Sequence, residues 1–173
     1  MPFVFREFVI RSWEPRDREA AAAIIGSVLA EYGLNWEPED ADRDVVEVET
    51  CYLNVGGEFW VVERDGSLVG TAAYYPVPQG TNAVEIRKMY VLPEARGQGL
   101  GRALLGTLEE AIAAKGYSQV WIETATVLKE ATRLYERNGY VRPTGEEGIP
   151  ETTRCDRVYV KHLSVHSDMS SGT

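Results

Sequence analysis

Residues 96–102 read Arg-Gly-Gln-Gly-Leu-Gly-Arg and combine three glycines with two arginines in one short segment. Gly97, Gly99 and Gly101 allow a tight turn in which backbone N–H groups approach a bound anion closely. A segment with an apolar stripe follows at once, and the positive end of its helix dipole would point at the same place. Arg102 falls in the first turn of that helix, where a cation is unfavourable unless an anion is bound beside it. The spacing therefore predicts a site for a phosphate-bearing ligand.

Two other phosphate-binding loops do not fit this segment. A dinucleotide-binding fingerprint needs glycines at its first, third and sixth positions, but the sixth position counted from Gly97 is Arg102. The loop of nucleotide hydrolases needs Gly-Lys-Ser/Thr, a tripeptide that the chain lacks. Residues 96–101 instead resemble the pyrophosphate-binding signature Gln/Arg-x-x-Gly-x-Gly/Ala of the GNAT superfamily of acetyl-CoA-dependent N-acetyltransferases. They also lie between a Met-Tyr-Val-Leu-Pro strand end and a helix with an apolar stripe, which strengthens the resemblance.

The resemblance implies that acetyl-CoA is the co-substrate. The backbones of Met89, Tyr90 and Val91 would hydrogen-bond the amides of the pantetheine arm. The pyrophosphate would be held by the loop residues, which are Arg96, Gly97, Gln98, Gly99, Leu100, Gly101 and Arg102. A plain glycine turn with surface arginines is the alternative interpretation of the same residues.

Acetyl transfer from a thioester to an amine needs an uncharged nucleophile, a polarised carbonyl and a proton for the departing thiolate. Residues 131–140 read Ala-Thr-Arg-Leu-Tyr-Glu-Arg-Asn-Gly-Tyr and resemble the family segment A-x-x-L-Y-x-x-x-G-F/Y. In that segment the tyrosine hydroxyl approaches the thioester sulfur, so Tyr135 is the expected general acid. The alternative is a packing residue on an amphipathic helix. The family often has asparagine seven residues earlier, where this chain has Leu128.

Two glutamates compete for the role of general base. Glu85 matches the strand position used by the histone acetyltransferase branch, and Glu123 matches that of the ribosomal-protein N-terminal acetyltransferase branch. Both fall on the two strands that the resemblance places beside a gap. Each glutamate is also open to the interpretation of a solvated strand residue or a partner of Arg87. We favour Glu123 slightly, because its strand neighbours the helix of Tyr135.

The rest of the chain predicts the elements that position these residues. Apolar spacing, turn residues such as Asp65-Gly66, and glycines after helices set the expected boundaries. The expected strands are 8–13, 58–64, 68–75, 83–92, 119–124, 140–142 and 154–163, and the expected helices are 16–32, 38–53, 99–115 and 127–138.

This order resembles the GNAT fold along nearly the whole domain, with a specific match from Glu85 to Tyr140 and an architectural one elsewhere. The resemblance implies an α+β fold of three α/β/α layers with about four helices. Its mixed, mostly antiparallel sheet would have seven strands, and a V-shaped gap would splay the central parallel pair. One acetyltransferase domain is expected over residues 1–163, followed by a flexible C-terminal tail at 164–173.

Composition and charge exclude several classes of partner. The chain has 173 residues, 44% of them hydrophobic, and a net charge of -9, which argues against a nucleic-acid partner. No apolar run approaches the roughly 20 residues that span a bilayer, and no secretory signal opens the sequence, so no membrane contact and a cytoplasmic location are expected. Cys51, Cys155, His162 and His166 lack the spacing of a metal site, and no metal is expected.

The acceptor is expected to be an amine of a small molecule or a peptide. By the resemblance, residues 32–53 and 143–154 wall its pocket, and both segments are acidic. One hypothesis is that Trp36 and some of these carboxylates receive a cationic amine. They are Glu37, Glu39, Asp40, Asp42, Asp44, Glu146, Glu147 and Glu151. A solvated acidic face is the alternative.

Direct transfer in a ternary complex is expected, because no cysteine lies in the motif region to carry an acetyl group. Two alternatives stay open at this stage. One is a non-catalytic module that binds acyl-CoA as a sensor, and the other is an acyltransferase that uses a longer acyl group. A homodimer is also open.

Overall fold

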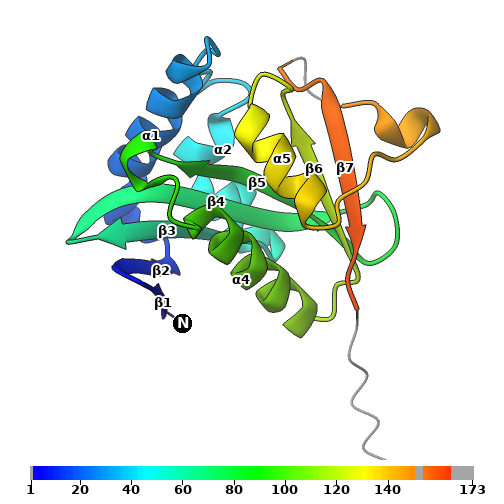
Figure 1. Ribbon diagram of the computed structural model, residues 1–173, viewed down its shortest axis with the longest axis horizontal. Coiled ribbons are helices and arrows are strands. Elements are labelled where there is room, and N and C mark those ends of the chain that lie inside the picture. The colour runs from blue at the N-terminus through cyan, green and yellow to red at the C-terminus, as the bar shows by residue number, and fades with distance from the viewer. Residues whose placement is uncertain (1, 151–153, 165–173) are drawn as a thin grey trace, which may run out of the picture.

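The computed structural model describes residues 2–150 and 154–164, apart from the side chains of residues 146 and 147. Seven strands form one sheet in the order of the chain, and only the β5–β6 pair is parallel (Figure 1). The strands are β1 (Pro2–Phe5), β2 (Phe8–Ser12), β3 (Glu58–Arg64), β4 (Ser67–Val77), β5 (Ala83–Val91), β6 (Gln119–Thr124) and β7 (Arg157–His162).

Helices cover both faces of this sheet. The α-helices are α1 (Arg18–Glu31), α2 (Arg43–Val46), α3 (Val48–Cys51), α4 (Leu100–Ala114) and α5 (Lys129–Arg137). Short 3-10 turns lie at η1 (Pro15–Asp17), η2 (Leu53–Val55), η3 (Pro93–Ala95) and η4 (Gly145–Gly148). Within the described residues, no helix has both the length and the apolar character to cross a membrane.

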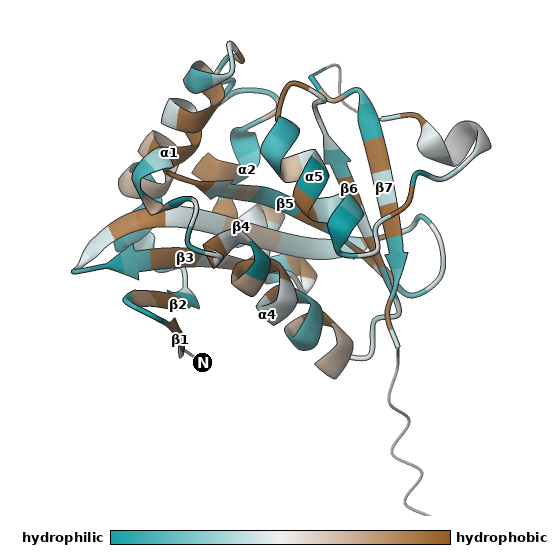
Figure 2. Ribbon diagram, viewed as in Figure 1, coloured by the Kyte–Doolittle hydropathy of each residue, from teal (hydrophilic) through white to brown (hydrophobic). Residues whose placement is uncertain are grey.

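The strand β3 shows why two helical layers are needed. Trp60 and Val62 pack with the residues of α4 and α5, whereas Phe59 and Val61 pack with those of α1, α2 and α3. Successive side chains of a strand point to opposite faces, so an unbroken apolar strand must be covered on both sides. In Figure 2, brown apolar segments run along α4, whose buried residues are Leu100, Leu104, Leu105, Leu108 and Ile112. The expected α/β/α layering is therefore confirmed.

The predicted hairpin between β3 and β4 is also present. Arg64 pairs with Ser67, which leaves Asp65 and Gly66 as a two-residue turn. Both turn residues have positive φ, 52° and 79°. Two successive positive φ angles are the requirement of the type I′ turn, which Asp-Gly satisfies readily.

Three predicted boundaries differ from the structure. The strand β1 was not expected, because its turn to β2 holds no glycine and instead places Arg6 at a φ of 52°. The expected strand 140–142 contributes only one bridge, between Val141 and Val160. The expected helix 38–53 is divided into α2 and α3, because the backbone at Glu47 leaves the helical region at φ -112° and ψ 51°. The sheet still has seven strands.

The strands β5 and β6 pair only along part of their length. Their parallel register runs from Ala83–Gln119 to Ile86–Ile122 and then stops. Beyond this point β5 stays paired with β4, and β6 stays paired with β7. The two central strands therefore separate after Ile86 and Ile122, as the V-shaped gap of the expected fold requires. The predicted tail lies outside the described residues from 165 onward.

Candidate active site

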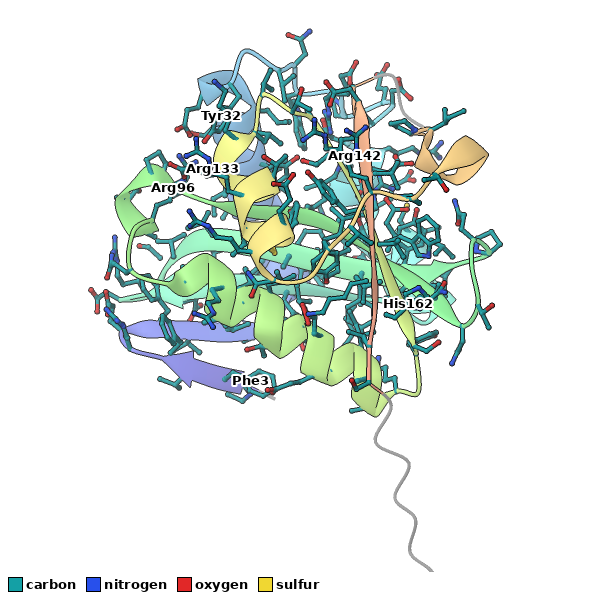
Figure 3. All side chains as sticks on the ribbon, turned by 45° about the vertical axis from the view of Figure 1, so that its right-hand side comes forward. Phe3, Tyr32, Arg96, Arg133, Arg142 and His162 are labelled. Carbon is teal, nitrogen blue, oxygen red and sulfur yellow. The ribbon has the colours of Figure 1, made fainter. Side chains whose placement is uncertain are left out.

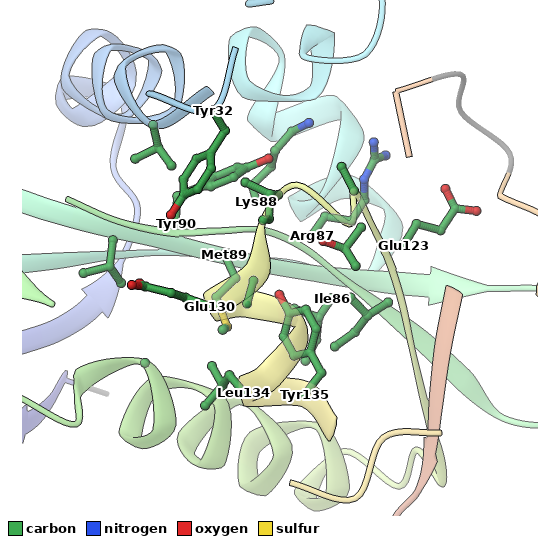
Figure 4. Close-up of a pocket in the computed structure, with 18 of the residues that line it drawn as sticks. Tyr32, Ile86, Arg87, Lys88, Met89, Tyr90, Glu123, Glu130, Leu134 and Tyr135 are labelled. Carbon is green, nitrogen blue, oxygen red and sulfur yellow. The ribbon is translucent and has the colours of Figure 1, made fainter. Parts of the chain in front are cut away.

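A cavity of about 340 Å³ opens where β5 and β6 separate (Figure 4). Strand residues form one side of it, and the loop before α4 and the buried side of α5 form another. Its lining includes residues 85–91 of β5, residues 122–125 at the end of β6, and the expected catalytic residue Tyr135. The cavity thus joins the glycine loop to all three predicted catalytic side chains.

The glycine loop has the backbone geometry that the sequence predicts. Gly97 and Gly99 have φ angles of 77° and 82°, and Gly99 is the N-cap of α4. The first N–H groups of a helix have no partner within it, so those of α4 remain available beside this loop. Of the predicted pyrophosphate residues, all but Gln98 line the cavity.

The two loop arginines differ in their partners. Arg96 donates two hydrogen bonds to the Glu31 carboxylate at 2.6 and 2.8 Å, and its Nε donates to the Val91 carbonyl at 2.9 Å. The bonds from Arg96 also lower the pKa of Glu31. Arg102 is exposed, and no ion pair joins it to another described residue. Arg96 therefore fastens the loop to α1 and β5, while the charge of Arg102 stays available to a ligand.

A β-bulge shapes the cavity side of β5. Thr71 pairs with Tyr90 and Ala73 pairs with Arg87, so two residues of β5 face a single residue of β4. Lys88 lies in this bulge at a φ of 52°, and the Thr71 hydroxyl donates to its carbonyl at 2.7 Å. A bulge leaves peptide groups outside the ladder. Of the three residues expected to contact the pantetheine arm, Met89 lies in the bulge, Tyr90 and Val91 follow it in the ladder with β4, and all three line the cavity.

A buried ionic cluster holds Lys88 in this conformation. Its Nζ lies 2.9 Å from Asp42 Oδ1 and 3.3 Å from Asp44 Oδ1. Arg154 donates two bonds to Asp42 at 2.7 and 2.8 Å, and the Tyr52 hydroxyl donates to Asp44. Burial by itself would raise the pKa of the Asp42 carboxyl, but the bonds from Arg154 and the charge of Lys88 outweigh burial and lower the pKa to about 2.

The structure does not support the acidic acceptor pocket. Among the described residues, the cavity is lined by Tyr32, Leu34 and Ala41 from the first segment, and by Arg154 from the second. Trp36 and the five expected carboxylates of residues 37–44 are not in the lining, and two of those carboxylates are neutralised in the ionic cluster. Glu151 and the side chains of residues 146 and 147 lie outside the described part of the chain.

Tyr135 projects from α5 into the cavity (Figure 4). The residue is only 4% exposed, and its ring meets those of Tyr140 and Tyr159 at centroid distances of 5.9 and 6.0 Å. Burial raises the pKa of Tyr135, so its hydroxyl keeps its proton at neutral pH. The same residue therefore packs in the core and presents a protonated donor to the cavity.

Both candidate bases line the same cavity. Glu85 is 8% exposed, accepts a hydrogen bond from the Tyr75 hydroxyl at 3.4 Å, and lies 3.8 Å from Arg87 Nε. Glu123 directly follows Ile122, the last residue of β6 that pairs with β5. The geometry brings both carboxylates to the opening of the gap and does not choose between them.

Sequence reasoning missed several residues of this cavity. Cys155 enters it from the segment before β7, and Glu31 fixes Arg96 from α1. Arg154 ends the segment 143–154 that was expected to wall the pocket, but its pairing with Asp42 was not predicted. Their contacts reach across the fold, so no local spacing marks them. The half-buried thiol of Cys155 also means that a cysteine does lie at the cavity, although the glycine motif contains none. No cluster of three or more metal-ligating side chains occurs over residues 2–150 and 154–164.

Comparisons with known proteins agree on one family. The model of the acetyltransferase (GNAT) family matches residues 22–140. The uncharacterized N-acetyltransferase YjgM of Escherichia coli is 36% identical over 135 residues, which are 76% of this chain and 81% of that protein. Relatives from mouse and rat named for N-acetyltransferase 8 or its family also match, and the chain spans between 45 and 58% of their length.

Solved structures agree on the fold. A GNAT-family acetyltransferase of Staphylococcus aureus superposes with a TM-score of 0.82 at 22% identity, over 91% of this chain and 99% of that one. YncA of Salmonella typhimurium, a putative acetyltransferase solved with acetyl-CoA, gives a TM-score of 0.70 at 20% identity over 96% of this chain and all of that one.

Proposed function

The chain belongs to the GNAT family of acetyltransferases and is an N-acetyltransferase, and we propose that it transfers the acetyl group of acetyl-CoA directly to a primary amine. The acceptor is a small molecule or a peptide, bound together with acetyl-CoA in a ternary complex. One observation carries the proposal: a single cavity contains the glycine loop, the bulged edge of β5, Tyr135 and two glutamates. Residues 1–163 would act as one catalytic domain.

The cofactor would lie along the cavity from the loop to Tyr135. Its pyrophosphate would accept hydrogen bonds from the free N–H groups at the start of α4, with Arg102 adding positive charge. The space around Gly97 supports this placement, because a Cβ built there meets no atom within 4 Å. The pantetheine amides would pair with peptide groups of Met89, Tyr90 and Val91. Met89 lies in the bulge of β5, and Tyr90 and Val91 follow it in register with Thr71 and Gly70 of β4.

The side chains at the gap would move the protons. A lysine-like amine has a pKa of about 10.4, so making it neutral at pH 7 costs about 4.6 kcal/mol. Glu85 or Glu123, directly or through water, would take that proton before the nitrogen attacks the thioester carbonyl, and the nitrogen would release its second proton to water after the attack. The C–S bond then breaks, and the Tyr135 hydroxyl would protonate the departing sulfur. Burial raises the pKa of that hydroxyl, and burial of the departing thiolate raises its affinity for the proton as well.

The test is an assay of CoA release over a panel of amino acids, polyamines, aminoglycosides and peptides. Tyr135→Phe should lower kcat by about 10²-fold or more, because one positioned proton donor is lost. Its affinity for acetyl-CoA, measured by calorimetry, should not change. Glu85→Gln and Glu123→Gln should differ, and the variant that loses the base should lose the acidic limb of the pH–rate profile.

Cys155→Ser serves as the control for direct transfer, and it should keep most of the wild-type turnover. Full activity of Tyr135→Phe would show that Tyr135 is not the general acid. Binding of acetyl-CoA without CoA release from any amine would instead identify a binding module.

A further inference from the structure

Arg87 differs from the other well-buried arginines of the chain. The side chains of Arg11, Arg96 and Arg154 are 15, 22 and 13% exposed, and each donates two parallel hydrogen bonds to one carboxylate. The side chain of Arg87 is 25% exposed, yet no hydrogen bond joins it to any described residue. Its one ion pair, Nε to Glu85, spans 3.8 Å and exceeds hydrogen-bond length.

The surroundings of Arg87 hold the guanidinium in place without using its donors. Its central carbon lies 5.7 Å from the centre of the Tyr75 ring, a distance typical of a cation–π contact. A quarter of the Arg87 side chain is exposed, and Arg87 lines the cavity. A guanidinium fork held in this way matches the two oxygens of a carboxylate.

Arg87 lies at the end of the gap where the amine would react. Arg87 is the first residue of β5 after the last pair with β6, and Glu123 is the first such residue of β6. The two residues therefore flank the point where the strands separate. Figure 4 shows both side chains projecting to the same side of the cavity, away from α4. Glu85 adds a second carboxylate beside Arg87.

The other cations near this end of the cavity are already neutralised. Lys88 contacts Asp42 and Asp44, and both terminal nitrogens of Arg154 bind Asp42. Among the described cations that line this end of the cavity, Arg87 is thus the one that still has donors for a ligand.

We propose that the acceptor is an amine that carries a carboxylate close to it, as an α-amino acid or its side-chain derivative does. Arg87 binds the carboxylate in a bidentate pair, while Glu123 and Glu85 face the amine. A simple polyamine offers nothing to Arg87 and would place a second cation beside it. The inference rests on the proposed acetyltransferase function and specifies its substrate class.

The test compares α-amino acids with their own primary amides, for example leucine with leucinamide and phenylalanine with phenylalaninamide. Each pair keeps the shape and removes only the carboxylate charge. The wild type should favour the acid by about tenfold to a hundredfold in kcat/KM, the range for a charged hydrogen-bonded pair. The amine of the amide is less basic, so a larger fraction of it is neutral and able to react at pH 7. A preference for the acid would therefore have to come from binding of its carboxylate.

Arg87→Met should bring this ratio close to one by raising KM for the acids more than KM for the amides. Arg87→Lys should restore part of the preference, because a charge without the fork remains. Affinity for acetyl-CoA, measured by calorimetry, should stay the same in both variants. An unchanged ratio in Arg87→Met, or amides that match the acids in the wild type, would overturn the inference while acetyl transfer itself stands.

A binding measurement gives a second readout that does not need turnover. With CoA present, N-acetylleucine should bind the wild type at least about tenfold more tightly than N-acetylleucinamide, and Arg87→Met should bind the two equally. Equal binding to the wild type would refute the role of Arg87. Absence of CoA release from every amine, with acetyl-CoA bound, would instead refute the proposed function.

Discussion

At the scale of single residues, Asp42 connects the acceptor side of the cavity to the strand that would bind the cofactor. Its carboxylate is fully buried and accepts hydrogen bonds from Lys88, from Arg154 and from the backbone N–H of Glu37. Such a carboxylate contributes stability only in its ionised form. The neighbouring cations lower the pKa of Asp42 from 3.8 to about 2, so its contribution is complete above pH 4 and is lost as the pH falls toward 2.

We predict that Asp42→Asn lowers the free energy of unfolding by about 3–5 kcal/mol at pH 7, because two buried cations lose their counter-ion. The lowered pKa of Asp42 corresponds to roughly 2 kcal/mol of folding stability, which the wild type loses between pH 4 and 2. The variant should lack this part of the dependence of stability on pH. Urea denaturation at several pH values measures both effects. Asp40→Asn is the matched control, because Asp40 is exposed.

A loss of stability in Asp40→Asn as large as that in Asp42→Asn would show that any charge change in this segment matters. An Asp42→Asn protein with wild-type stability would show that Lys88 and Arg154 do not depend on this carboxylate. Either result would contradict the conclusion that the ionic cluster around Asp42 stabilises the bulge of β5.

At the scale of elements, the loop before α4 has to keep its backbone in a conformation that side chains disfavour. Gly97 and Gly99 have positive φ angles, and a Cβ at Gly97 meets no atom while one at Gly99 meets only Phe5 at 3.6 Å. Alanine at either position should therefore act through backbone strain, at about 1–2 kcal/mol, and not through a clash. We expect Gly97→Ala and Gly99→Ala to weaken acetyl-CoA binding as the N–H groups turn away from the pyrophosphate.

Gly106 provides the control within the same helix. It lies inside α4 with no positive φ, and a Cβ there also meets no atom within 4 Å. Gly106→Ala should raise the free energy of unfolding by about 0.5–1 kcal/mol and leave acetyl-CoA affinity unchanged. Calorimetry and urea denaturation of the three variants measure the two quantities. Equal affinity across all three would mean that the loop conformation does not matter to the cofactor.

The same elements show which features a sequence can predict. The loop, α4 and the Asp65-Gly66 turn follow from residues that are neighbours in the chain, and each was predicted close to its observed position. The split of α2 from α3 was not predicted, because Asp44 within it is held by Tyr52 and by Lys88 of a distant strand. The helix propensity of a segment does not depend on contacts with distant residues, so it cannot predict such partners.

The candidate site divides in the same way. Residues of the motifs, such as Gly97 and Tyr135, could be placed at the cavity from their spacing and their resemblance to a family. The pairing of Arg154 with Asp42 could not be predicted, because the two residues are 112 positions apart in the sequence. The carboxylates of residues 37–44 are a second case, because counting them does not reveal that Asp42 and Asp44 are already paired with internal cations.

At the scale of the whole molecule, a basic corner stands out against a net charge of -9. A second cavity lies beside the glycine loop. Its lining includes Arg102 of α4 and Arg133 and Arg137 of α5. No ion pair joins any of these three arginines to another residue within the described ranges. Figure 3 shows Arg133 at the same edge of the molecule as Arg96 and Tyr32. The phosphates of acetyl-CoA would arrive at this corner.

We predict that acetyl-CoA binding weakens with salt and that Arg133→Gln weakens it by about two- to fivefold at low salt, the value of one exposed charge pair. The difference should shrink at 0.15 M ionic strength, where the Debye length is about 8 Å. Lys129→Gln is the control: Lys129 is exposed on the same helix, lies outside both cavities, and changes the net charge equally. Calorimetry at several salt concentrations separates local from overall charge. If the two variants lose affinity equally, then the total charge of the molecule, and not the basic corner, attracts the cofactor.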